Sequence, residues 1–328
     1  MNNALRSAVS RFAYPVLISW PLLVGMVALT WFPASADPIM RKVLEVGIFL
    51  VCAVPVVCAL LVLEKKMPFW ADRGPTPEEK RNDLTHLGMC WFLVVPIAQA
   101  LTGVIVTRLL AEVIARLGPS LWPTQWPLLF QVGLAIVVAE FFQYWGHRFG
   151  HETEIGWRLH SVHHGPHHLY WLNSTRFHAL DQIVKITVQT LPLILLGCTP
   201  QVFLVFGAFT SIHGWVQHSN VAYRTRGFDL VLGTSANHRW HHSVKMSEAN
   251  HNYGLIVMFW DRLFGTFHSP SEYFRGKVGI GDMPNFPGTY LSQLMVPFRW
   301  KSLERTGGTL VSQDAALDDD DEMERETA

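Results

Sequence analysis

Four stretches of this sequence are uncharged and long enough to cross a lipid bilayer, and this feature limits the possible folds more than any other. A membrane-spanning helix needs roughly 20 mostly apolar residues, and its backbone must satisfy its own hydrogen bonds. The stretches are 13–32, 46–63, 87–107 and 126–139, and the last continues through Glu140 towards His147. With 49% hydrophobic and only 16% charged residues, the chain has too few charges to cover a soluble globule. The sequence therefore predicts an all-α, multi-pass membrane helical bundle.

The loop charges predict how this bundle is oriented. The first stretch lacks a small-residue cleavage site, so we expect a retained helix rather than a signal peptide. Basic residues are most frequent before the first stretch and in the loop after the second, which places the N-terminus and residues 64–83 in the cytoplasm. The fourth helix then returns near His147, so segment 147–180 is expected to be cytoplasmic. A further uncharged run, 186–212, is predicted either to dip into the membrane or to cross it twice.

Charge and cysteine content exclude other classes of partner and site. The 26 basic and 26 acidic residues cancel, so no overall field attracts nucleic acid. All four cysteines lie within apolar runs, where they are expected to be buried hydrophobic residues rather than disulfides or zinc ligands. Any metal chemistry must therefore use other side chains.

Histidine is the most informative residue type in the chain. Fourteen of the sixteen histidines lie between His147 and His251. They occur in groups with the sequences HRFGH (147–151), HSVHH (160–164), HGWVQH (213–218) and HRWHH (238–242). A spacing of three or four residues places side chains on one face of a helix. These groups therefore predict a metal site.

The first group extends a polar stripe along the fourth membrane helix. Glu140 and Tyr144 precede His147 and His151 on the same face. A carboxyl group inside a membrane helix is costly and usually has a partner. We therefore expect Glu140 to accept a hydrogen bond from a ligand histidine and Tyr144 to lie beside the ligands.

The number of histidines favours two metal ions. In each HxxHH group the adjacent pair points to two sides, so one group can hold one ion and lend a ligand to a second. The set comprises ten imidazoles, too many for one ion but suitable for two. Arg148 replaces the glutamate that a zinc protease needs beside its first histidine. An all-histidine shell is compatible with iron, copper, zinc or nickel. The candidate ligands are His147, His151, His160, His163, His164, His213, His218, His238, His241 and His242.

The order HRFGH, HSVHH, QHSN, HRWHH resembles the histidine boxes of the fatty acid hydroxylase and sterol desaturase superfamily of membrane di-iron oxygenases. The segments WLNSTRFHALD (171–181), NYG (252–254) and FWDRLFGTFH (259–268) are also similar to segments of that family, and the resemblance covers about residues 130–270. It implies that the box histidines are ligands of two irons. His213 matches fewer members, and Ala179 replaces the proline of the family's R-x-H-P-x-D/E segment. In that segment Arg176 and Asp181 are expected to order the cap and His178 to support the ligands. His251, just before the NYG segment, is also expected to support them.

The resemblance implies an oxidoreductase that uses O₂ and two external electrons to hydroxylate or desaturate a lipid C–H bond. The sequence has no haem segment, dinucleotide-binding glycine motif or ferredoxin cysteine set. Electrons are therefore expected from a separate protein of the ferredoxin or cytochrome b5 type. Sterols, acyl chains or sphingolipids, ether lipids and carotenoids all remain possible substrates.

The predicted organisation is N-terminal membrane helices in 1–125, the di-iron domain in 126–270, an extension in 271–313 and an acidic disordered tail in 314–328. The alternative functions are a histidine-rich membrane protein that handles metal, and a zinc-dependent membrane hydrolase. Transport would require ionisable residues deep within several helices, and three of the four predicted crossings have none at their centres.

The chain closes without an endoplasmic reticulum retrieval signal. A bacterial inner membrane is therefore expected, with the endoplasmic reticulum as the alternative.

Overall fold

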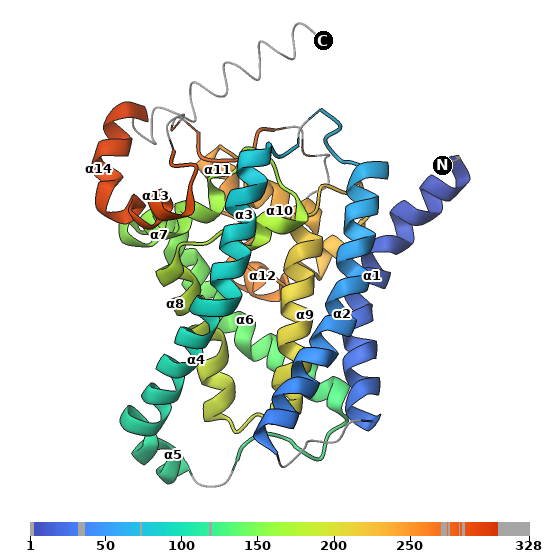
Figure 1. Ribbon diagram of the computed structural model, residues 1–328, viewed down its shortest axis with the longest axis vertical. Coiled ribbons are helices and arrows are strands. Elements are labelled where there is room, and N and C mark those ends of the chain that lie inside the picture. Colours follow the sequence, from blue (N-terminus) through green and yellow to red (C-terminus); the bar gives the residue numbers. More distant parts are fainter. Residues whose placement is uncertain are drawn as a thin grey trace, which may run out of the picture.

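The computed structural model describes residues 3–31, 37–72, 74–117, 120–269, 274, 276–281, 283 and 286–307. It is an all-α bundle with a cap of short helices at one end (Figure 1). The predicted extension, 271–313, is partly described. The predicted acidic tail, 314–328, lies outside the described residues. The long helices are α1 (Asn3–Trp31), α2 (Pro38–Lys66), α3 (Pro77–Met89), α4 (Val95–Val104), α6 (Leu128–Glu152), α8 (Ala179–Leu195) and α9 (Pro200–His218).

Four helical segments have the length and hydropathy of membrane spans, as the sequence predicted. They cover Asn3–Leu29, Ile39–Lys66, Pro77–Leu109 and Leu128–Glu152. Their outer faces carry large exposed apolar side chains, for example Phe92 at 87% exposure, which suits contact with lipid. The chain is therefore a multi-pass membrane protein.

The third span is a helix with two π-helical turns. It runs from α3 through η1 (Cys90–Val94), α4 and η2 (Ile105–Leu109), and α5 (Ala111–Leu117) follows it. Pro96 has no N–H to donate to the preceding turn. The wider turn of η1 directly before it accommodates this loss within a continuous helix.

The run at 186–212 forms the hairpin of α8 and α9. The two helices are joined at Gly197, whose φ of 81° favours glycine. The hydroxyl of Ser120, in the loop before α6, donates a bifurcated hydrogen bond to the carbonyl oxygens of Leu196 and Gly197, at 3.3 Å each. The hairpin turn thus lies at the end of the bundle opposite the cap (Figure 1). Both expectations for this run contain such a helical hairpin, and neither α8 nor α9 is among the four segments with the length and hydropathy of membrane spans.

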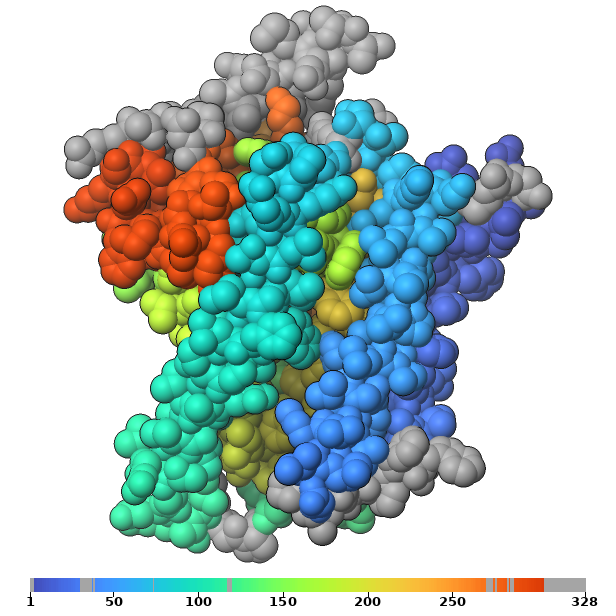
Figure 2. All heavy atoms as spheres, in the orientation of Figure 1, coloured from blue at the N-terminus to red at the C-terminus, as the bar shows by residue number. Residues whose placement is uncertain are grey.

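Helices from both predicted domains share one core. α1 packs against α9, and α4 packs against α8. The largest buried cluster joins Tyr14 and Leu17 of α1 to Val205 and Ile212 of α9. Figure 2 shows a groove between α2 and the α3–η1–α4 helix, and Phe49 crosses it to contact Trp91 with ring centroids 4.7 Å apart. Residues on both sides of the predicted boundary near 125 therefore contribute side chains to one buried cluster.

The cap consists of short helices connected by loops that hydrogen-bond to the end of α2. The Glu64 carboxylate accepts hydrogen bonds from the backbone N–H groups of Trp171 and Asn220 at 2.8 and 3.0 Å. The loop after α2 therefore lies at the same end of the bundle as the cap. Only isolated β-bridges occur among the described residues. The cap comprises α7 (Glu154–His164), η3 (Trp171–Thr175), η4 (Phe228–Leu230), α10 (Ser235–His241), α11 (Met246–Ala249), α12 (Phe259–Phe264), α13 (Tyr290–Leu294) and α14 (Val296–Gly307).

Candidate metal centre

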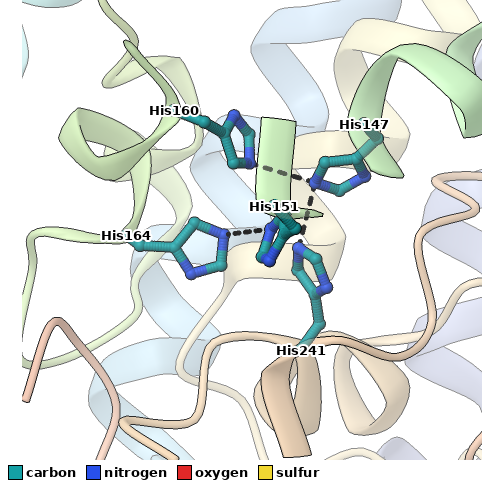
Figure 3. Close-up of side chains that lie close together, drawn as sticks. All are labelled: His147, His151, His160, His164 and His241. Carbon is teal, nitrogen blue, oxygen red and sulfur yellow. Dashed lines mark hydrogen bonds between the residues drawn. The ribbon is translucent and has the colours of Figure 1, made fainter. Parts of the chain in front are cut away.

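Nine histidines meet in two adjacent buried groups where the membrane bundle joins the cap. Within each group, one nitrogen of every ring lies within 4.8 Å of those of the other rings. Figure 3 shows the five rings of the first group turned towards one another. Stacking of His164 on His242, with centroids 4.1 Å apart, connects the two groups. We call them the first group, His147, His151, His160, His164 and His241, and the second group, His163, His218, His238 and His242.

Helical spacing explains how the rings are divided. On α7, His160 and His164 are four residues apart and join the first group, whereas His163 joins the second. On the last motif, His238 and His242 join the second group and His241 the first. Each HxxHH motif therefore contributes to both groups, and α6 and α9 supply the remaining ligand candidates.

In the first group, hydrogen bonds fix which ring nitrogen carries the proton. The Nδ1 atoms of His147 and His241 lie 2.7 and 2.9 Å from the carbonyl oxygens of Tyr253 and His251. A carbonyl oxygen only accepts, so both Nδ1 atoms must be N–H donors. The Nε2 lone pairs of these two neutral rings then face each other at 3.0 Å. His160 adds a third Nε2 at 3.1 Å from that of His147. Such converging lone pairs repel unless a cation lies between them.

The second group has the same arrangement. His163 donates from Nδ1 to the Arg176 carbonyl oxygen at 3.1 Å, and His218 donates to the side-chain oxygen of Asn173 at 3.1 Å. Asn173 itself donates to the His168 carbonyl at 2.7 Å, which orients its amide. The Nε2 of His238 then lies 2.8 Å from that of His218 and 3.0 Å from that of His242. Both groups thus present inward-facing lone pairs that fit a metal ion.

Burial keeps five of the rings in the cap neutral. It lowers the pKa of the cap histidines His163, His164, His238 and His242 well below the usual value, and neighbouring histidines lower it further. The pKa of His241 falls to about 3, mainly because burial disfavours its charged form. Neutral imidazole is the form that binds metals. These five rings can therefore bind a metal at neutral pH without first losing protons.

The structure reveals supporting groups that the sequence reasoning did not identify as contacts of ligands. The Asp181 carboxylate accepts from His160 Nδ1 at 2.9 Å, and Asn250 lies 3.3 Å from His151 Nδ1. Asp181 was expected only to order the cap. Its position at the first turn of α8, within the RFHALD segment, was the available signal. The supporting carbonyl groups of Arg176, His251 and Tyr253 leave no signal in side-chain patterns.

Glu140 supports the site by a different route from the one expected. Its carboxylate accepts no hydrogen bond from a ligand histidine. It accepts from the backbone N–H groups of Leu255 and Ile256, both at 2.9 Å. It thus fixes the loop whose Tyr253 carbonyl orients His147. The reason is geometric, because this loop lies between the α6 carboxylate and the rings.

His213 lies outside both groups, so nine of the ten predicted ligands come together. Its Nε2 is 3.2 Å from the hydroxyl of Tyr14 on α1. His218 is five residues further along α9, a rotation of about 140° at 3.6 residues per turn. The two rings therefore leave α9 on different sides, and only His218 faces the centre.

The other predicted supporting residues act indirectly. Tyr144 contacts Thr266 at 2.9 Å and accepts from Arg148 at 3.2 Å. His178 caps α8 by accepting from the N–H of Leu180 at 3.2 Å. His251 contributes through its backbone carbonyl to His241. Tyr144 and His178 therefore order the surrounding elements.

Replacing Asp181 with asparagine is expected to lower iron affinity or turnover about 10- to 100-fold, because the weaker acceptor no longer holds His160 in one orientation. Iron per chain and initial rates measure the effect. Asp72→Asn, at an exposed position, is the matched control. Equal iron content and rates in both variants would contradict a supporting role for Asp181.

Comparisons with known proteins agree with this architecture. A family model described as fatty acid hydroxylase matches residues 132–266. The ornithine lipid hydroxylase of Rhizobium tropici is 36% identical over 306 residues, covering 92% of this chain and 87% of that protein. The alkylglycerol monooxygenases of Danio rerio and Homo sapiens are 32% and 30% identical, but the matches cover only 32% and 31% of those proteins. No solved structure matches the chain. The family match and the near full-length relative show that this chain is a membrane oxidoreductase belonging to the fatty acid hydroxylase and sterol desaturase superfamily.

Proposed function

We propose that this protein is a di-iron oxygenase that hydroxylates a C–H bond of a polar membrane lipid. The observation that carries the proposal is the pair of buried groups in which neutral imidazoles direct their Nε2 lone pairs at one another. Nine imidazoles exceed the needs of one ion, and the absence of carboxylates from both groups suits iron chemistry at high positive charge. Two irons bound there would supply O₂ activation.

The overall reaction is balanced by an external reductant. The lipid C–H bond and one O₂ take up two electrons and two protons, and the products are the lipid C–OH and water. The chain contributes the rigid ligand set, oriented by Asp181, Asn173 and the Tyr253 carbonyl. The buried rings also exclude water from the centre, since all nine are at most 5% exposed. Electrons are proposed to come from a separate protein of the ferredoxin or cytochrome b5 type.

The relatives narrow the proposed substrate. The R. tropici relative, which aligns over nearly the whole chain, is named for ornithine lipid, and the others for alkylglycerols. We therefore place an acylated amino acid lipid first and an ether lipid second. The first relative is named a hydroxylase and the others monooxygenases, which favours hydroxylation over desaturation.

The proposed location is a bacterial inner membrane with the histidine groups on the cytoplasmic side. The basic loop after α2 lies at the same end of the bundle as the cap, joined to it by hydrogen bonds from Trp171 and Asn220 to Glu64. The positive-inside rule therefore assigns this end to the cytoplasm. An electron donor would approach the cap from there.

Detergent-purified protein is expected to contain about two irons per chain, consistent with the two groups. Mössbauer spectra of an iron-57 sample should show that the irons are coupled. Incubation with O₂, an electron donor and N-acyl ornithine should add one oxygen atom, detected by mass spectrometry. Stoichiometric zinc that iron cannot replace would favour a hydrolase or a metal-handling protein instead.

A further inference from the structure

A lysine lies next to the candidate metal centre, and its ammonium forms no ion pair with a carboxylate among the described residues. Lys185 is one helical turn after Asp181 on α8, and its ammonium lies 4.3 Å from the centroid of the Phe177 ring. The same ring stacks on His163 at 4.0 Å and 10°. One phenyl ring therefore contacts both the lysine and a ligand candidate.

The carboxylates near Lys185 are engaged elsewhere. Its charge interacts with Asp181 and Glu140. Asp181, however, holds His160, and Glu140 holds backbone N–H groups. In the described part of the chain the lysine ammonium makes no hydrogen bond or ion pair. Leaving a partly buried ammonium without a hydrogen-bond acceptor is costly, so an external anion is the natural partner.

Amide groups without hydrogen-bond partners lie on α8, one turn before and one turn after the lysine, and on α6, which packs against α8. The side-chain atoms Gln182 Oε1 and Gln189 Nε2 on α8, and Gln143 Oε1 on α6, are buried without hydrogen-bond partners among the described residues. Gln143 and Gln189 are only 4% and 7% exposed. Native proteins rarely leave such atoms unsatisfied unless a ligand or water completes them.

The packing of α6 against α8 brings these groups to neighbouring levels. A Cβ built on Gly146 of α6 would lie 3.6 Å from the Val188 side chain of α8, so these two residues lie at the same level of the bundle. Gln143 is one turn from Gly146, and Gln189 follows Val188. Gln182 also lines a small cavity with Phe177, next to the π-helical turn η1. The polar groups therefore extend from the level of the ligands into the membrane part of the bundle.

We propose that Lys185 binds the anionic group of the lipid head group beside the metal centre, with Gln189 Nε2 as a second donor. The Gln143 and Gln182 side-chain oxygens then accept hydrogen bonds from N–H or O–H groups of the same head group. The inference rests on the proposed function and specifies its substrate as an acidic lipid. Because Phe177 contacts both Lys185 and His163, the oxidised C–H bond lies in or next to the head group and not in the middle of an acyl chain. A carboxylate and a phosphate share the required chemistry.

Lipid binding to the full-length, detergent-purified protein tests this inference without requiring turnover. The probes are N-palmitoyl ornithine, its carboxyl methyl ester, and palmitoyl lysophosphatidic acid. Wild-type protein should bind the free acid at least about tenfold more tightly than the ester, because a charge-assisted contact is lost. Lys185→Met should bind acid and ester equally, whereas Lys185→Arg should retain the preference. Tight binding of the phosphate probe alone would identify phosphate as the anion.

The control variant is Lys66→Met, which removes an exposed lysine at the end of α2 and should leave the preference unchanged. Iron content measured on the same samples separates the two proposals, since a chain without iron but with the acid preference retains the lipid site. Equal binding of acid, phosphate and ester by wild-type protein would overturn the inference, even if Lys185→Met does not fold. An unchanged acid preference in a folded Lys185→Met protein would overturn it too.

Discussion

Replacing His241 with alanine is expected to remove iron from the first group and to reduce lipid hydroxylation at least a hundredfold. Groups that only orient a ligand are worth about 10- to 100-fold, so a ligand itself should cost more. His163→Ala should have the same effect through the second group. Each variant should still enter the membrane, because the spanning helices do not depend on these rings. Iron per chain and turnover of a supplied lipid measure both effects.

Two other histidines provide controls for these variants. His167 is exposed and lies outside both groups, so His167→Ala should retain iron and activity. His213 is buried against Tyr14, so His213→Ala should retain both irons even if it lowers stability. Retained turnover in both His241→Ala and His163→Ala would refute the ligand assignment. Loss of one iron in His213→Ala would restore the ten-ligand prediction.

Replacing Asp83 with alanine is expected to lower the free energy of unfolding by about 3–5 kcal/mol, the usual effect of breaking a buried ion pair. Asp83 on α3 is fully buried and accepts from Arg176 at 2.5 Å and from the Tyr170 hydroxyl at 2.5 Å. Its removal leaves the Arg176 guanidinium, 5% exposed, without its countercharge. Unfolding in mixed micelles with increasing SDS measures the change.

The double variant Asp83→Leu with Arg176→Met separates charge from packing. Because it removes both charges, most of the lost stability should return. Glu45→Ala, which breaks the exposed Lys42–Glu45 pair, should change stability by less than about 1 kcal/mol. A double variant as unstable as Asp83→Ala would show that the buried pair does not act through its charges. The Arg176 carbonyl also orients His163, so Asp83→Ala should lower iron content too.

The four membrane spans could be predicted because their signal is local. An uncharged run long enough to cross the bilayer must be helical, whatever surrounds it. Helix ends were less predictable: α1 begins at Asn3, before the charged Arg6 and Arg11, because hydropathy marks the apolar part of a helix and not its caps. That the helix continues through Pro96, directly after a π-helical turn, was likewise not predictable from hydropathy.

The predicted histidines also show that local spacing is predictable and long-range contacts are not. Nine of ten candidates meet because their motifs place them on inward faces of α6, α7, α9 and α10. His213 and Glu140 could not be placed from periodicity, since their partners Tyr14 and Leu255 are 199 and 115 residues away in sequence. Long-range contacts of this kind leave no mark in local spacing.

By itself, the sequence determined the membrane class, the histidine motifs and the resemblance to a family, because each depends on spacing along one helix or on the order of motifs. Only the tertiary structure decided how the histidines divide into two groups, which ring nitrogens face inward, and that Lys185 lies beside Phe177 and the ligands. These features depend on how α6, α8, α9 and the cap pack together. Packing brings distant backbone carbonyls and side chains into contact, and those contacts set the chemistry of the site.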